Sequence, residues 1–105
     1  MPKLDEATIL QLKSNYKQLL LVTDRDGDEY VCRLPTQAEI ERHSTTAING
    51  SKMEAMYGLV TNCVVWPDKP TLTKMLEEYA MLVVTLEHKI CEFAKLDQSA
   101  TAKKL

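Results

Sequence analysis

The spacing of apolar positions first indicates a short helix. Behind Asp5, a residue type that caps helices, Ile9, Leu12 and Tyr16 recur at intervals of three and four residues. This periodicity predicts a helix near Glu6–Asn15. The spacing then changes to that of strands.

Two runs of β-prone residues, Leu19–Thr23 and Glu29–Leu34, flank a polar stretch that contains Asp26-Gly27. Asp-Gly between such runs predicts a hairpin, because the turn needs backbone with positive φ. A two-residue turn there pairs Thr23 with Tyr30, Leu21 with Cys32 and Leu19 with Leu34. The opposite face then carries Leu20, Val22 and Val31 among charged residues. That face is too apolar to lie open to solvent, so we expect something to cover it.

Helical patterns follow Pro35. Thr36 and Glu39 have the spacing of a capping box, and we expect the helix to reach about Ile48 and to stop in a left-handed Asn49-Gly50. A second capping box opens with Ser51. The apolar face of that second helix, which we expect to be core, comprises Met53, Met56, Tyr57, Val60 and Val64.

The last helical segment begins after Pro67 and Pro70, with Thr71 as the expected cap. No Gly or Pro interrupts Glu78–Met81, so one long helix over 72–96 and two shorter helices both agree with the sequence. Residues 97–105 lose all periodicity and are expected to form a disordered tail. The pattern predicts one α+β domain over 1–96, mostly helical: an N-terminal helix, one hairpin and three to four further helices.

Charge and cysteine usage exclude several classes of protein. The 13 Lys+Arg and 15 Asp+Glu residues give a net charge of −2, which does not suit a nucleic-acid phosphate backbone. No apolar stretch approaches the ~20 residues of a membrane span, and the first residues hold no signal-peptide core. Cys32, Cys63 and Cys91 are too widely spaced for a typical zinc site and odd in number, so we expect buried, reduced thiols in a cytoplasmic protein.

The sequence contains only weak signals for a metal site or a catalytic site. The acidic stretch 24–28 resembles a calcium loop, but Glu29 and Pro35 occupy its sixth and twelfth positions, where such loops need Gly and a carboxylate. His43 and His88 lie in polar helical stretches and are expected to face water, without the partners of a metal or nucleophilic site. We therefore expect no enzyme activity, no metal and no cofactor.

The remaining feature is surplus apolar surface, which favours a protein that binds other proteins. The candidate binding residues are Leu20, Val22 and Val31 on the hairpin, Met53 and Met56 on the helix after Ser51, and Trp66 at its end. Methionine suits adaptable surfaces and tryptophan is frequent in interface hot spots. Packing in the core is the other interpretation for Trp66 and the methionines.

Two segments resemble phage tail assembly chaperones. The first is a strand that ends in Pro35-Thr36 with Glu39 behind it; the second runs from Leu59-Val60 through Cys63-Val64 to Pro67-Asp68. The resemblance covers about residues 16–96, and the length and order of elements agree. Members of that family often interrupt the final helical segment with Pro or Gly, which this chain does not.

The resemblance implies a chaperone that binds the tape measure protein of a long-tailed phage and keeps it soluble while tail tube subunits assemble around it. It also implies several copies per tape measure protein, hence a homo-oligomer, with the tail tube protein as a possible second partner. Such a protein acts in the host bacterial cytoplasm and is absent from the mature virion. The alternative is a small cytoplasmic adaptor or inhibitor that binds a partner protein.

Overall fold

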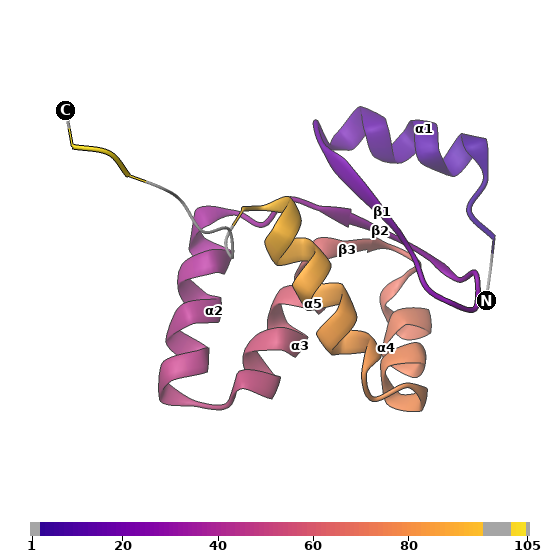
Figure 1. Ribbon diagram of the computed structural model, residues 1–105. Coiled ribbons are helices and arrows are strands. Elements are labelled where there is room, and N and C mark those ends of the chain that lie inside the picture. The colour runs from indigo at the N-terminus through magenta and orange to yellow at the C-terminus, as the bar shows by residue number, and fades with distance from the viewer. Residues whose placement is uncertain (1–2, 96–101, 105) are drawn as a thin grey trace.

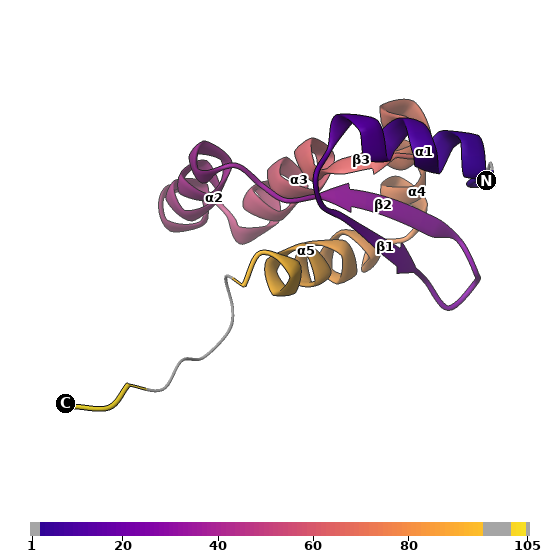
Figure 2. The same cartoon turned by 90° about the horizontal axis from the view of Figure 1, so that it is seen from above.

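The computed structural model describes residues 3–95 and 102–104 and has the α+β fold that the sequence predicts (Figure 1). A three-stranded antiparallel sheet lies between an N-terminal helix and a helical layer (Figures 1 and 2). In the described residues the elements follow the order α1 (Glu6–Asn15), β1 (Leu19–Thr23), β2 (Glu29–Arg33), α2 (Gln37–Asn49), α3 (Lys52–Cys63), β3 (Val64–Trp66), α4 (Lys69–Glu78) and α5 (Leu82–Phe93). The third strand is an addition to the predicted hairpin.

The hairpin turn differs from the predicted two-residue turn. The Asp24 N–H donates to Asp28 O at 2.9 Å and the Gly27 N–H donates to Asp24 O at 3.1 Å, which encloses a three-residue loop. Gly27 has φ +85°, the left-handed backbone that glycine adopts without steric cost. The turn is thus a type I turn followed by a glycine bulge.

The longer loop changes the strand register by one residue. Leu21 pairs with Val31, where the two-residue turn predicted Cys32, and Leu20 pairs with Cys32. Because side chains alternate between the faces of a sheet, this shift exchanges the β2 partners of every β1 residue. The prediction that Leu20, Val22 and Val31 share one face is therefore wrong.

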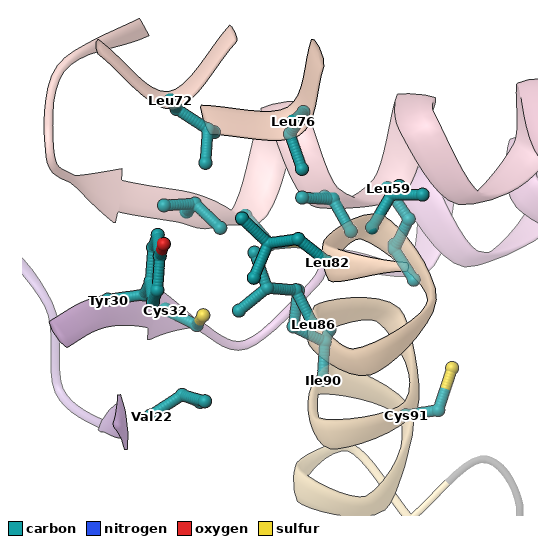
Figure 3. Packing of buried hydrophobic residues seen from close by; sticks show 14 residues of the cluster. Val22, Tyr30, Cys32, Leu59, Leu72, Leu76, Leu82, Leu86, Ile90 and Cys91 are labelled. Carbon is teal, nitrogen blue, oxygen red and sulfur yellow. The ribbon is translucent and has the colours of Figure 1, made fainter. Parts of the chain in front are cut away.

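One face of the sheet forms the hydrophobic core with the helical layer. Val22, Tyr30 and Cys32 point from the sheet toward α4 and α5, as Figure 3 shows. The helices contribute the fully or almost fully buried side chains Leu59, Val60, Leu72, Leu76, Leu82, Val83, Leu86 and Ile90. Transfer of these side chains out of water is the main stabilising contribution to this layer. We call this side of the sheet the core face.

The helix boundaries follow the capping residues. The predicted capping box of α2 is present: Glu39 N–H donates to the Thr36 hydroxyl, and the Thr36 N–H donates to the Glu39 carboxylate. The helix ends at Asn49. The prediction that left-handed backbone at Asn49-Gly50 ends it is wrong, since Gly50 has φ −121°. The Ser51 hydroxyl accepts from Glu54 N–H, as predicted.

The buried face of α3 is rotated from the predicted one. Ala55, Leu59, Val60 and Cys63 are buried, whereas Met53 and Tyr57 are exposed. Of the predicted helix face, Val60 and Val64 are buried and Met56 packs on the edge of the core. The reason is that both α2 and α5 pack against α3, and together they decide which of its faces is covered.

The segment after Pro67 forms two helices. Asp68 caps α4 by accepting the Thr71 N–H at 3.1 Å, so the expected Thr71 cap is wrong by three residues. The chain leaves α4 at Tyr79 in an extended conformation and re-enters helix at Leu82. A straight helix over 72–96 would be about 37 Å long. The break lets α4 and α5 both pack on one core.

Candidate protein-binding surface

The second face of the sheet, which we call the outer face, is covered by α1. Leu19, Leu21 and Val31 lie on this face because the register pairs Leu21 with Val31 and Leu19 with Arg33. A groove of about 270 Å³ lies between the sheet and α1. Its lining is almost entirely apolar and consists of Leu4, Ile9, Leu12, Lys13, Leu19, Leu21 and Val31. We call it the α1 groove.

Helix α1 is formed locally and packs loosely. The Asp5 carboxylate caps it by accepting the Thr8 N–H at 2.7 Å, which lowers the pKa of Asp5. None of the residues of α1 is buried, and Leu10 is 69% exposed. Ile9 and Leu12 are half-buried against the sheet. The helix therefore shields the outer face without closing it, and Leu21 beneath it remains 52% exposed.

The three hairpin residues of the predicted binding face are placed on opposite sides of the sheet. Val22 belongs to the core and Leu20 packs against that core. Val31 is 5% exposed, yet it lines the α1 groove. Part of the apolar surface that the sequence indicates is thus covered by the core of the same chain. Of the three residues, only Val31 lines a groove that is open to another molecule.

The helical candidates are also separated. Met53 is 46% exposed at the start of α3, while Met56 packs on the core and Trp66 is half-buried in β3. Further large apolar side chains are exposed that are not among the predicted binding residues: Leu10, Leu21, Ile48, Tyr57, Tyr79 and Met81. A three-residue turn would have indicated Leu21, because that turn pairs it with Val31 on the outer face.

An ion pair holds the outer face to the helical layer. The Arg33 guanidinium donates to both carboxylate oxygens of Glu39 at 2.8 Å, and also to the Asn62 carbonyl at 2.9 Å. The hydrogen bonds from Arg33 lower the pKa of Glu39 to about 2. This bidentate contact joins the end of β2 to the start of α2 and the end of α3.

The thiols match their predicted burial. Cys32, Cys63 and Cys91 are all buried, and none of the three forms a disulfide. Desolvation raises the pKa of Cys32 to about 12 and that of Cys63 to about 11, so both remain protonated at neutral pH and are poor nucleophiles. Burial also raises the pKa of the fully buried Tyr30.

His43 and Cys91 meet at one carboxylate. His43 Nε2 lies 3.8 Å from Glu87 Oε2, and the Cys91 thiol donates to Glu87 Oε1 at 3.3 Å. The His43 side chain is only 20% exposed, so the expectation that it faces water is wrong; His88, at 59%, is exposed. The cavity beside His43 measures about 40 Å³, room for about one water molecule and not for a substrate.

The acidic residues of the hairpin tip serve the turn. Asp24 Oδ1 accepts the N–H groups of Asp26 and Asp28 at 3.0 and 2.9 Å. Over residues 3–95 and 102–104, no group of three or more His, Cys, Asp or Glu side chains is arranged to hold a metal ion. Within the same residues, no helix is both long and apolar enough to cross a bilayer.

Comparison with known proteins places the fold in a family. A solved structure titled "Structure of uncharacterised protein rbstp2171 from bacillus stearothermophilus" is 23% identical, covers 91% of this chain and 99% of its own, and superposes with a TM-score of 0.74. At this identity the likeness shows a shared fold. No curated protein matches the chain. The family model described as "Domain of unknown function (DUF6848)" matches residues 12–103, and the chain therefore belongs to the DUF6848 family.

Proposed function

We propose that this protein is a non-enzymatic phage tail assembly chaperone that binds the tape measure protein and keeps it soluble while the tail tube assembles. The observation that carries the proposal is the α1 groove, an open apolar space of about 270 Å³ between α1 and the outer face. Open apolar grooves of this kind are where proteins accept apolar side chains of a partner.

The chemistry of the groove suits an amphipathic client. Its sheet side presents Leu19, Leu21 and Val31, and its helix side presents Leu4, Ile9 and Leu12. A tape measure protein is a long chain with apolar residues at helical spacing, which aggregates unless those residues are covered. Lys13 is the charged residue of the lining and favours a client with acidic residues beside its apolar stripe.

The proposal includes the assembly context that the sequence resemblance implies. The client is bound in the host bacterial cytoplasm, the chaperone self-associates so that several copies cover one client, and it leaves before the virion is complete. The tail tube protein is a possible second partner, which would couple release of the chaperone to polymerisation of the tube.

Co-expression tests the proposal. The chain is expressed with the tape measure protein encoded beside it in the same phage genome, and the soluble yield of the tape measure protein is compared with and without the chaperone. We expect a several-fold increase for the wild type and its loss for Leu21→Asp, which puts a charge into the groove. Ile48→Asp is the matched control, since Ile48 is 81% exposed on α2, outside the groove.

The outcomes separate the alternatives. No change in yield with the wild-type chain contradicts the proposal. A stable complex with another cytoplasmic protein, at one copy each and without an effect on the tape measure protein, supports the adaptor or inhibitor alternative. Equal effects of Leu21→Asp and Ile48→Asp contradict the assignment of the client to the α1 groove.

A further inference from the structure

The free edge of strand β1 is unprotected. The sheet order is β1-β2-β3, so β1 and β3 are its edges, and β1 lies at the side away from β3 in Figure 2. Leu19–Thr23 holds five residues without a charge, a proline or a bulge. Edge strands usually carry one of these features, because bare edges pair with other chains. The β3 edge is different: it has three residues and ends at Pro67.

The backbone of β1 has hydrogen-bonding groups available at this edge. The Asp24 N–H donates toward β2, to Asp28 O. In an antiparallel ladder the pairs alternate, so Val22 and Leu20 also face β2, while Leu19, Leu21 and Thr23 direct their N–H and C=O groups outward. In the part of the chain that the structure describes, no strand pairs with this side of β1.

The charges around the strand select its partner. Lys13 and Lys17 precede β1, and the hairpin tip that follows it is acidic overall, since Asp24, Asp26 and Asp28 outnumber Arg25. An antiparallel partner strand must therefore begin with basic residues, beside the tip, and end with acidic residues, beside Lys17. The β1 strand of a second copy has this order of charges. We infer that two copies of this chain pair antiparallel through their β1 edges.

The pairing joins the two outer faces. A two-fold axis perpendicular to the sheet keeps both outer faces, and hence both α1 helices, on the same side of one continuous six-stranded sheet. Leu21, which is 52% exposed, is covered near the axis. The two α1 grooves then lie next to each other on one surface of the dimer.

The first experiment blocks the edge. Thr23→Pro removes one outward N–H and leaves the bonds to β2 in place, because Thr23 faces away from β2 at the backbone. Sedimentation of the full chain over a range of concentrations should show a dimer for the wild type and a monomer for Thr23→Pro, with circular dichroism to confirm the fold. A wild-type chain that is monomeric at every concentration, or a folded Thr23→Pro dimer, would overturn the inference.

The second experiment reverses charges at the two ends of β1 and needs no proline substitution in the strand. Lys17→Glu and Asp26→Lys should each weaken the dimer about tenfold, since each removes complementary charge and adds repulsion. An equimolar mixture of the two variants should dimerise as well as the wild type, because the glutamate introduced in one copy then lies beside the lysine introduced in the other. Arg42→Glu, on exposed α2, is the control that should change nothing. A mixture that dimerises no better than the separate variants refutes the antiparallel arrangement, whereas the soluble yield of the tape measure protein with the wild-type chain tests the proposed function.

Discussion

The two faces of the sheet are built from the same three strands but differ in how completely they are covered. On the core face, Tyr30 and Cys32 are 0% exposed beneath α4 and α5. On the outer face, Leu21 is half exposed and a groove of about 270 Å³ separates the strands from α1. The core face supplies most of the stability, whereas the outer face keeps apolar side chains that are only partly covered.

The largest expected effect comes from the same substitution at two adjacent residues, one on each face of the sheet. Val22→Asp places a charge among buried apolar side chains and should lower the free energy of unfolding by about 4 kcal/mol or more. Leu21→Asp, the same change one residue earlier, should cost about 1 kcal/mol, because its side chain is 52% exposed. Urea unfolding followed by circular dichroism measures both. Similar losses would show that α1 and the outer face form a core of their own.

Disruption of the Arg33–Glu39 ion pair should give a loss of stability of intermediate size. Glu39→Gln should lower the stability at neutral pH by about 2 kcal/mol, since it removes the negative charge and one of the two oxygens that accept from Arg33. The pKa of Glu39 is lowered from 4.5 to about 2, so its contribution is complete above pH 4.5 and is lost as the pH falls toward 2.

Urea titrations at neutral pH and at about pH 3 measure this dependence. The wild type should lose more stability between the two conditions than Glu39→Gln does. Parallel losses for both proteins would mean that other carboxylates govern the acid sensitivity. Glu41→Gln, on the same helix and exposed, is the matched control and should behave as the wild type.

A substitution in the hairpin turn, which sets the strand register, should give the smallest loss of stability. Gly27→Ala should cost about 1 kcal/mol, because φ is +85° there and a side chain in left-handed backbone is strained. The space around the added carbon is open, so no clash adds to this cost. Thermal unfolding measures the loss, and Gly58→Ala is the control: it lies within α3, its added carbon also meets open space, and it should be neutral or stabilising. A Gly27→Ala protein as stable as the wild type would contradict the expected strain of a side chain at this position.

Local chemistry made the helices predictable. Asp5, Thr36 and Ser51 each cap the helix that the sequence places behind them, and α1 has the predicted bounds. The break between α4 and α5 was not predictable from local signals, since Glu78–Met81 contains neither Gly nor Pro. It depends on how two apolar helix faces reach one core. The predicted tail at 97–105 lies mostly outside the described residues.

The candidate binding surface was harder to predict, for one physical reason. Asp26-Gly27 agrees with either a two-residue or a three-residue loop, and the choice moves each β2 residue to the other face. A two-residue loop places Leu20 and Val22 on the second face and Leu21 in the core, whereas in the structure Val22 is buried, Leu20 packs against the core and Leu21 is 52% exposed. An apolar edge strand such as Leu19–Thr23 carries no alternation that could decide between the two registers.

Strand β3 follows helix α3 with no residue between Cys63 and Val64. At the same junction the Arg33 guanidinium of β2 donates to the Asn62 carbonyl at 2.9 Å. The direction in which α3 leaves the sheet is therefore fixed twice at this junction, by the chain itself and by a hydrogen bond from the neighbouring strand.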